Sequence, residues 1–166
     1  MRVVDSPNCD ERPPGTEVTL AVLHCISLPP GQYGGGAIER FFTNRLDPHA
    51  HPYFAQIHGM QVSAHFLIRR DGELVRFVPV ERRAWHAGAS GWRGRERCND
   101  FSVGIELEGT EETPFEDAQY TTLIEVLRQL KLKEVAAHSD VAPGRKSDPG
   151  PHFDWPRLLH ALAAAY

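Results

Sequence analysis

A histidine and an aspartate bracket a short polar segment near the carboxyl end of the chain. His138 begins this segment, and Asp148 ends it between Lys146 and Pro149. Imidazole and carboxylate groups are both common ligands of divalent metals such as zinc, and Lys146 would place a positive charge beside any group that the metal polarises. For Asp148 taken alone, a turn residue before proline is the more common interpretation. The segment therefore predicts half of a zinc hydrolase site, and another part of the chain must supply the missing ligand and base.

A second histidine offers the missing ligand. His24 lies near the end of the apolar segment 18–27, which predicts a strand buried on both faces. Strand ends in such folds face the binding crevice, although a core histidine bonded to main chain is an equal alternative for His24 alone. Two histidines and Asp148 leave an open fourth position, which is typical of a catalytic zinc. Cys25 should not share the metal, because neighbouring strand residues point to opposite faces.

The candidate general base is a carboxylate inside a predicted strand. Glu106 belongs to the mostly apolar segment 101–107, where a carboxylate is costly unless it is paired or used. Glu108 shares its face by alternation and is the alternative, as is a surface pair at the strand end. We favour Glu106 because Ile105 and Leu107 flank it.

A long loop is predicted from Trp85 to Arg97, with aromatic rings and three arginines. Guanidinium groups bind carboxylates in a bidentate manner, so the loop suits a ligand that carries carboxylates. For Arg93 and Arg95 an ordinary solvated loop is the favoured interpretation. His65 is predicted on a strand, either in the core or in a site. The remaining histidines are expected at the surface or in loops: His49, His51, His58, His152 and His160.

The elements that must position these residues alternate along the chain. Residues 1–17 are expected to form an irregular arm. The patterns predict strands over 18–27, 101–107 and 134–137, a hairpin over 63–69 and 73–78, and helices over 37–44, 115–130 and 154–164 with Asp154 as N-cap. The fold class is therefore α/β (α+β), with one central mixed sheet flanked by helices.

The composition fits one domain over residues 1–166. Hydrophobic residues make up 41% and charged residues 24%, which is ordinary for a globular protein. The net charge of −4 gives no support to a nucleic-acid or membrane partner, and no protein partner is evident. The cysteines, Cys9, Cys25 and Cys98, lack CxxC spacing and any disulfide framework. Without an apolar leader or a segment of transmembrane length, the chain is expected in the cytoplasm.

Seven ordered blocks of the sequence match the signatures of a known family: residues 24–31, 63–65, 68–72, 83–88, 94–102, 104–109 and 145–151. The similarity runs from about Val4 to Trp155. In these blocks the chain resembles the AmpD-type family of cytoplasmic 1,6-anhydro-N-acetylmuramoyl-L-alanine amidases of Gram-negative bacteria. The resemblance implies the fold of peptidoglycan-recognition proteins and phage amidases. It also implies hydrolysis of the amide between (1,6-anhydro)-N-acetylmuramic acid and L-alanine of small muropeptides, in peptidoglycan recycling.

The resemblance also implies roles for individual residues. One catalytic zinc would be held by His24, His138 and Asp148. Glu106 and Lys146 would serve catalysis. Trp85 and Arg97 would contact the muropeptide, with Arg97 at a peptide carboxylate.

Two departures from the family pattern concern the site. Cys25 stands where the family usually has asparagine, and the segment 131–137 is shorter than in other members. The alternatives are a domain that binds muropeptides without cutting them, which typically lacks a metal ligand, and a lytic amidase that acts on intact cell-wall polymer.

Overall fold

A mixed sheet forms the middle layer of the computed structural model, which describes residues 1–132 and 134–164. The sheet has six strands in the described part of the chain, in the order β1-β5-β4-β9-β3-β10. Within this sheet β4 and β5 pair in antiparallel fashion, and the other neighbours run parallel. The strands are β1 (Arg2–Val3), β3 (Leu20–Ile26), β4 (Phe66–Ile68), β5 (Leu74–Arg76), β9 (Ser102–Glu108) and β10 (Glu134–Ala137).

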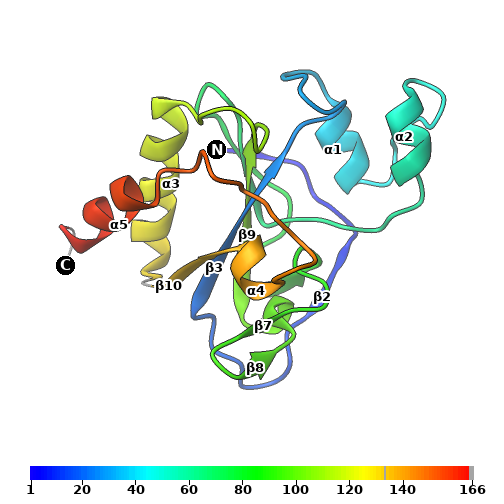
Figure 1. Cartoon of the computed structure of the whole chain (residues 1–166). Coiled ribbons are helices and arrows are strands. Elements are labelled where there is room, and N and C mark those ends of the chain that lie inside the picture. The colour runs from blue at the N-terminus through cyan, green and yellow to red at the C-terminus, as the bar shows by residue number, and fades with distance from the viewer. Residues whose placement is uncertain (133, 165–166) are drawn as a thin grey trace.

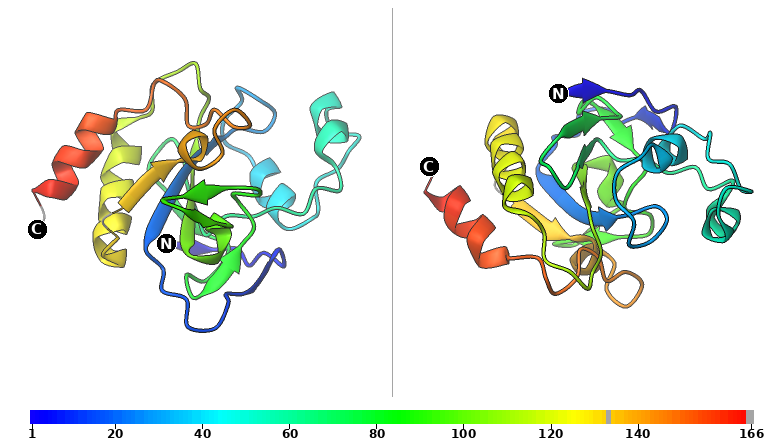
Figure 2. Two further views of the ribbon diagram at one scale, coloured as in Figure 1. Left: turned by 60° about the horizontal axis from the view of Figure 1, so that its bottom comes forward. Right: turned by 90° about the horizontal axis from the view of Figure 1, so that it is seen from above.

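Helices cover both faces of this sheet (Figure 1). On one face lie α3 (Asp117–Leu130) and α5 (Trp155–Ala163), and on the other lie α1 (Ala37–Phe42) and α2 (Pro52–Ile57). Figure 2 shows the two helical layers with the sheet between them. The predicted fold class, one central mixed sheet flanked by helices, is confirmed.

Strand alternation decides which side chains face the site. Leu23 on β3 and Ile105 on β9 pack in the core cluster with α3 and α5, so His24 and Glu106 point to the opposite face. The parallel register pairs His24 with Glu106 and Leu23 with Ala137. The carboxyl ends of β3, β9 and β10 therefore meet, and His138 follows directly beside His24.

The predicted strands, the hairpin and the three helices are confirmed within a few residues. The expected irregular arm is wrong, because it contains β1 and β2 (Cys9–Glu11); β2 pairs with β6 (Arg82–Ala84). These strands pair with segments far along the chain, so no local sequence pattern predicts them.

The long loop predicted from Trp85 to Arg97 is also incomplete as a description. The segment 85–97 contains the hairpin of β7 (Gly91–Trp92) and β8 (Arg95–Glu96), followed by η1 (Cys98–Asp100).

Two short helices were not predicted. His138 begins the single turn α4 (His138–Val141) instead of a loop. α2 has Pro52 in its first turn, and Nδ1 of its N-cap His51 accepts a hydrogen bond from the Tyr53 amide. Each buries at most two residues, which is too few to show an apolar repeat in the sequence.

The segment predicted to be shortened, residues 131–137, contains the C-cap of α3 and strand β10. Lys131 caps α3 in the left-handed conformation (φ 56°), and position 133 lies outside the described residues. None of the described helices combines the length and the apolar character that crossing a membrane requires.

Candidate metal centre and active-site cavity

Three side chains converge at the carboxyl ends of the parallel strands. Nδ1 of His24 lies 3.0 Å from Nδ1 of His138 and 3.3 Å from Oδ2 of Asp148. The third separation, from His138 Nδ1 to Asp148 Oδ2, is 3.2 Å. The three residues predicted as metal ligands therefore form one potential metal-binding group.

The hydrogen bonds of the two imidazoles show that this donor set fits a cation. Nε2 of His138 lies 3.1 Å from the carbonyl oxygen of Ala87, which can only accept, so this nitrogen carries the proton. Nε2 of His24 lies 2.9 Å from Nδ1 of His86. With a cation bound and the proton of each ring on Nε2, both Nδ1 atoms can present lone pairs to the point that Asp148 also faces. Four tetrahedral ligands at zinc distances stand about 3.3 Å apart, close to the separations found in this structure.

The polypeptide segment between His138 and Asp148 folds back so that its ends meet. The amide of Ser139 donates to the carbonyl of Asp148 at 3.1 Å, and the amide of Lys146 donates to Ala142 at 3.0 Å. Burial would raise the pKa of the Asp148 carboxyl, but its hydrogen bonds with His138 and His24 outweigh burial and hold that pKa well below its usual range. The carboxylate is therefore ionised and suited to bind a cation.

Glu106 lies beside the three converging groups, with Oε1 3.9 Å from His24 Nδ1. Its Oε2 is buried and has no hydrogen-bond partner among the described residues. Burial, followed by the negative charge of Asp148, raises the pKa of this carboxyl well above its usual value, while Lys146 lowers it. A buried carboxyl with a free oxygen can exchange a proton with a bound molecule.

Glu108, the alternative base, is fully engaged in the fold. Its carboxylate accepts hydrogen bonds from the Arg69 guanidinium at 3.0 Å and from the amides of Gly34 and Arg70 at 2.9 and 3.1 Å. The structure thus favours Glu106 over Glu108 as the group available for chemistry.

A cavity of about 570 Å³ opens over the converging side chains. Trp85 and Lys146, two of the predicted site residues, line it together with Glu106. Arg97 is exposed in the left-handed conformation before η1 and is not among the described residues that line the cavity. Its proposed contact with a peptide carboxylate stays a prediction.

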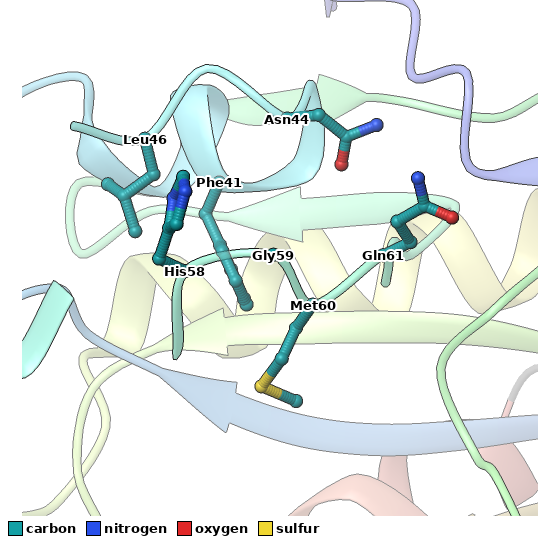
Figure 3. Close-up of a pocket in the computed structure, with 7 residues that line it drawn as sticks. All are labelled: Phe41, Asn44, Leu46, His58, Gly59, Met60 and Gln61. Carbon is teal, nitrogen blue, oxygen red and sulfur yellow. The ribbon is translucent and has the colours of Figure 1, made fainter. Parts of the chain in front are cut away.

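A smaller pocket of about 90 Å³ lies beside α1 (Figure 3). Phe41 and Met60 line both this pocket and the large cavity, so these two side chains separate the two spaces. The described residues of its lining include one histidine, His58, and no carboxylate. This pocket therefore offers no second set of groups for metal binding or proton transfer.

The other side chains that the sequence left open have structural places. His65 is fully buried; its Nδ1 accepts from the Gly104 amide at 3.0 Å and its Nε2 donates to the Arg82 carbonyl at 2.8 Å. It is a core histidine. Cys25 borders the cavity but does not belong to the potential metal-binding group of the described chain, as strand geometry predicted. Burial raises the pKa of its thiol.

Sequence reasoning missed His86, Asn99 and Arg145 near the centre. His86 bonds directly to His24, Asn99 holds the main chain of His86, and Arg145 donates to the Ala87 carbonyl at 2.6 Å. The only signal for His86 was its position next to Trp85 in the predicted ligand-binding loop.

Known proteins resemble this chain over nearly its whole length. The family model described as N-acetylmuramoyl-L-alanine amidase matches residues 14–151. The 1,6-anhydro-N-acetylmuramyl-L-alanine amidase AmpD of Escherichia coli K12 is 56% identical over 95% of this chain and 89% of its own length. AmpD of Enterobacter cloacae is 54% identical over 97% of this chain and 89% of its own length.

Solved structures agree with the sequence matches. A crystal structure of a selenomethionine AmpD derivative superposes with a TM-score of 0.94 at 52% identity, covering 97% of this chain and 93% of that one. The Escherichia coli amidase AmiD, in complex with anhydro-N-acetylmuramic acid-L-Ala-D-γ-Glu-L-Lys, gives a TM-score of 0.62 at 27% identity, with coverages of 93% and 65%. The chain therefore belongs to the N-acetylmuramoyl-L-alanine amidase family, as a hydrolase of the AmpD type.

Proposed function

We propose that this protein is a zinc-dependent amidase that cleaves the amide between 1,6-anhydro-N-acetylmuramic acid and L-alanine in small muropeptides. One amidase domain would cover residues 1–166, and one zinc ion would be held by His24, His138 and Asp148. The observation that carries the proposal is the convergence of three metal-binding atoms, 3.0 to 3.3 Å apart, beside a buried carboxyl with an unpaired oxygen.

Glu106 is the proposed general base and acid. Its buried Oε2 has no partner in the described chain, so it is free to accept a proton from an attacking water. The same carboxyl can then deliver a proton to the departing amine of L-alanine, so one group serves both halves of the hydrolysis. The raised pKa of Glu106 favours the first transfer, because it makes proton uptake by the carboxylate easier.

Lys146 is the proposed stabiliser of the negative oxygen that develops on the scissile carbonyl. Lys146 lines the cavity, and its positive charge lies near both Glu106 and His24. This charge lowers the pKa of His24, and it opposes the rise in the pKa of Glu106 that burial and Asp148 cause. A cation at the edge of a partly enclosed cavity stabilises a developing oxyanion more than it would in water. When bound, zinc would act as a Lewis acid and lower the pKa of water to about 7.

The substrate class rests on the matched relatives. Two matched structures hold anhydromuropeptides: AmiD with an anhydro-N-acetylmuramic acid tripeptide, and the Pseudomonas aeruginosa protein AmpDh3 with anhydromuramic pentapeptide. Trp85 borders the cavity in this chain and offers an aromatic face to the sugar or stem peptide. A cytoplasmic role in peptidoglycan recycling is proposed from the AmpD resemblance, and cell fractionation would test it.

The decisive experiment combines metal analysis with digestion of a defined substrate. Purified protein is expected to contain one zinc per chain and to release L-alanyl peptide from anhydro-N-acetylmuramoyl tripeptide, as followed by mass spectrometry. A chelator should abolish turnover and added zinc should restore it. Full turnover by metal-free protein would contradict the mechanism, and preferred digestion of intact sacculi would favour a lytic amidase.

A further inference from the structure

We propose that the dipeptide His86-Ala87 is a positioning element that orients both histidine ligands of the metal centre. The His86 imidazole fixes the ring of His24, and the Ala87 carbonyl fixes the ring of His138. This inference rests on the proposed zinc site, and it assigns these residues a role in metal affinity and not in contact with substrate.

The contact to His24 requires one particular set of tautomers. For His24 to present a free Nδ1, its Nε2 must carry the proton and donate to Nδ1 of His86 across 2.9 Å. His86 must then carry its own proton on Nε2, which lies 3.2 Å from Oγ of Ser102. Ser102 donates in turn to the Cys98 carbonyl. The chain of donors ends on a main-chain oxygen, so its direction is fixed from the protein side.

The contact to His138 is made by the next residue along the chain. The Ala87 carbonyl accepts from His138 Nε2 at 3.1 Å and from the Arg145 guanidinium at 2.6 Å. Arg145 also donates to the Ala89 carbonyl at 2.8 Å. Arg145 precedes Lys146 and Asp148 in sequence, so this bond ties the segment that carries the third ligand to the same dipeptide.

Asn99 fixes the dipeptide itself. Its Oδ1 accepts hydrogen bonds from the amides of both His86 and Ala87, at 3.1 and 2.9 Å. Asn99 is 6% exposed, and its own carbonyl accepts from the guanidinium of Arg12 at 3.1 Å. The buried Asn99 side chain therefore fixes the main-chain position of both His86 and Ala87.

Strand β9 leaves space for the His86 ring at one position. A Cβ atom on residue 104 would lie 2.6 Å from Cδ2 of His86, so only glycine allows the ring to lie over the strand. The φ angle of Gly104 is not in the left-handed region, so the requirement is one of space and not of backbone conformation.

The expected consequence concerns zinc affinity. Groups that bond the second nitrogen of a ligating histidine fix its tautomer and ring orientation, and their loss typically weakens metal binding by about 10–100-fold. Without the His86 acceptor, the Nε2 proton of His24 loses its partner, and the competing tautomer with Nδ1 protonated cannot ligate.

The test compares two replacements of His86 in the full chain. His86→Leu removes the acceptor, whereas the amide oxygen of His86→Asn can occupy the place of Nδ1 and keep it. Zinc dissociation constants are measured by competition with a chromogenic chelator, and the absorption spectrum of the cobalt-substituted protein reports ligand geometry. We expect about a 10–100-fold weaker affinity and an altered spectrum for His86→Leu, with both largely restored in His86→Asn.

Two further variants keep the test decisive. Asn99→Ala leaves the His86 ring in place but releases its main chain, and it should weaken zinc binding in the same direction. Gln119→Leu is the matched control: Gln119 is also buried and bonded to main-chain carbonyls, but it lies on α3, away from the centre. It should destabilise the fold and leave zinc affinity and the cobalt spectrum unchanged.

The outcomes separate this inference from the proposed function. If wild-type protein binds no zinc, the proposed function itself is wrong. If wild-type binds zinc and His86→Leu and Asn99→Ala bind it equally tightly with the same cobalt spectrum, the positioning role is wrong. An equal loss of affinity in Gln119→Leu would also overturn it, because the effect would then be general destabilisation.

Discussion

Two glutamates on one strand show how local environment separates a chemical group from a structural one. Glu106 and Glu108 share a face of β9, and both are buried. Glu108 is bonded to Arg69 and to two amides, whereas one oxygen of Glu106 has no partner in the described residues. Residue type and alternation are identical for the pair, so only their neighbours make one a candidate base.

The first prediction is a separation of activity from metal content at Glu106. Glu106→Gln removes the proton acceptor but keeps the shape of the side chain. We expect kcat to fall by about 10²–10⁴-fold, while zinc stays at one per chain in elemental analysis. Near-normal kcat would mean that another group is the base.

Glu108→Gln is the matched control for this experiment. The substitution weakens the ion pair with Arg69, which is buried because Arg69 is only 8% exposed. Losing a hydrogen bond to a charged group costs about 1.5–3 kcal/mol. We therefore expect a lower free energy of unfolding in urea and little change in kcat of the folded enzyme.

The second prediction concerns Asp148, the proposed carboxylate ligand of zinc. Asp148→Asn removes the negative charge from the group that faces both Nδ1 atoms. Since a neutral amide is a poorer ligand for zinc than a carboxylate, the variant should lose zinc on dialysis and lose turnover with it. Elemental analysis and the muropeptide assay measure the two effects. A variant that retained zinc but not turnover would instead place Asp148 outside the ligand set.

At the scale of elements, parallel strand register builds the centre. His24 and Glu106 are register partners on β3 and β9, and β10 ends one residue before His138. Their carboxyl ends meet on one edge, which is where ligands bind in sheets of this kind. The helices α3 and α5 hold the sheet from the opposite face and need not contact the site.

The third prediction tests that division of labour at the start of α5. The Asp154 carboxylate accepts from the Arg157 amide at 3.0 Å and caps the helix. Asp154→Ala should lower the free energy of unfolding by about 1 kcal/mol, whereas Asp154→Ser should retain most of it. Urea denaturation measures the difference. Zinc content and kcat should be unchanged in both, and a loss of zinc in Asp154→Ala would show that α5 does influence the centre.

At the scale of the whole molecule, the N-terminal arm is anchored through the sheet to the site. The guanidinium of Arg12 donates to the carbonyls of Val80, Asn99, Asp100 and Ser102. Burial, followed by the charge of Arg83, lowers the pKa of Arg12 to about 10. The arm thus reaches the same η1 segment that holds the His86-Ala87 dipeptide.

The fourth prediction is a loss of stability in mild acid that comes partly from His65. Burial lowers its pKa to about 4 in the folded protein, from the ordinary value of 6.5. Between these pH values the unfolded chain binds the proton and the folded one does not, so the free energy of unfolding falls as pH falls. The group contributes roughly 3 kcal/mol over this range.

Urea unfolding at several pH values measures this slope. His65→Asn, which has no imidazole to protonate, should show a shallower fall between pH 6.5 and 4. The control is His160→Asn, which replaces an exposed histidine on α5 and should keep the wild-type slope. An unchanged slope in His65→Asn would assign the acid sensitivity to other groups.

Much of the fold followed from local patterns. The apolar run of β3, the hairpin of β4 and β5, and the capped helix α5 were predicted because each has its own residue signature. The short elements β1, β2 and α2 were not, since they are held by distant main-chain partners or by a single capping side chain. Local sequence has no information on a partner that lies far along the chain.

The candidate site divides in the same way. Residue chemistry brought His24, His138, Asp148 and Glu106 forward, because imidazole and carboxylate groups are common zinc ligands and a carboxylate inside an apolar strand is costly unless it is paired or used. Only the tertiary structure decided that three of them stand within 3.3 Å of one another. It also decided that Glu108 is bonded into the fold, and that His86 and Ala87 bond to the rings of His24 and His138. These outcomes depend on register and on hydrogen bonds between remote segments, which is why the sequence determined the chemistry available and the fold determined its arrangement.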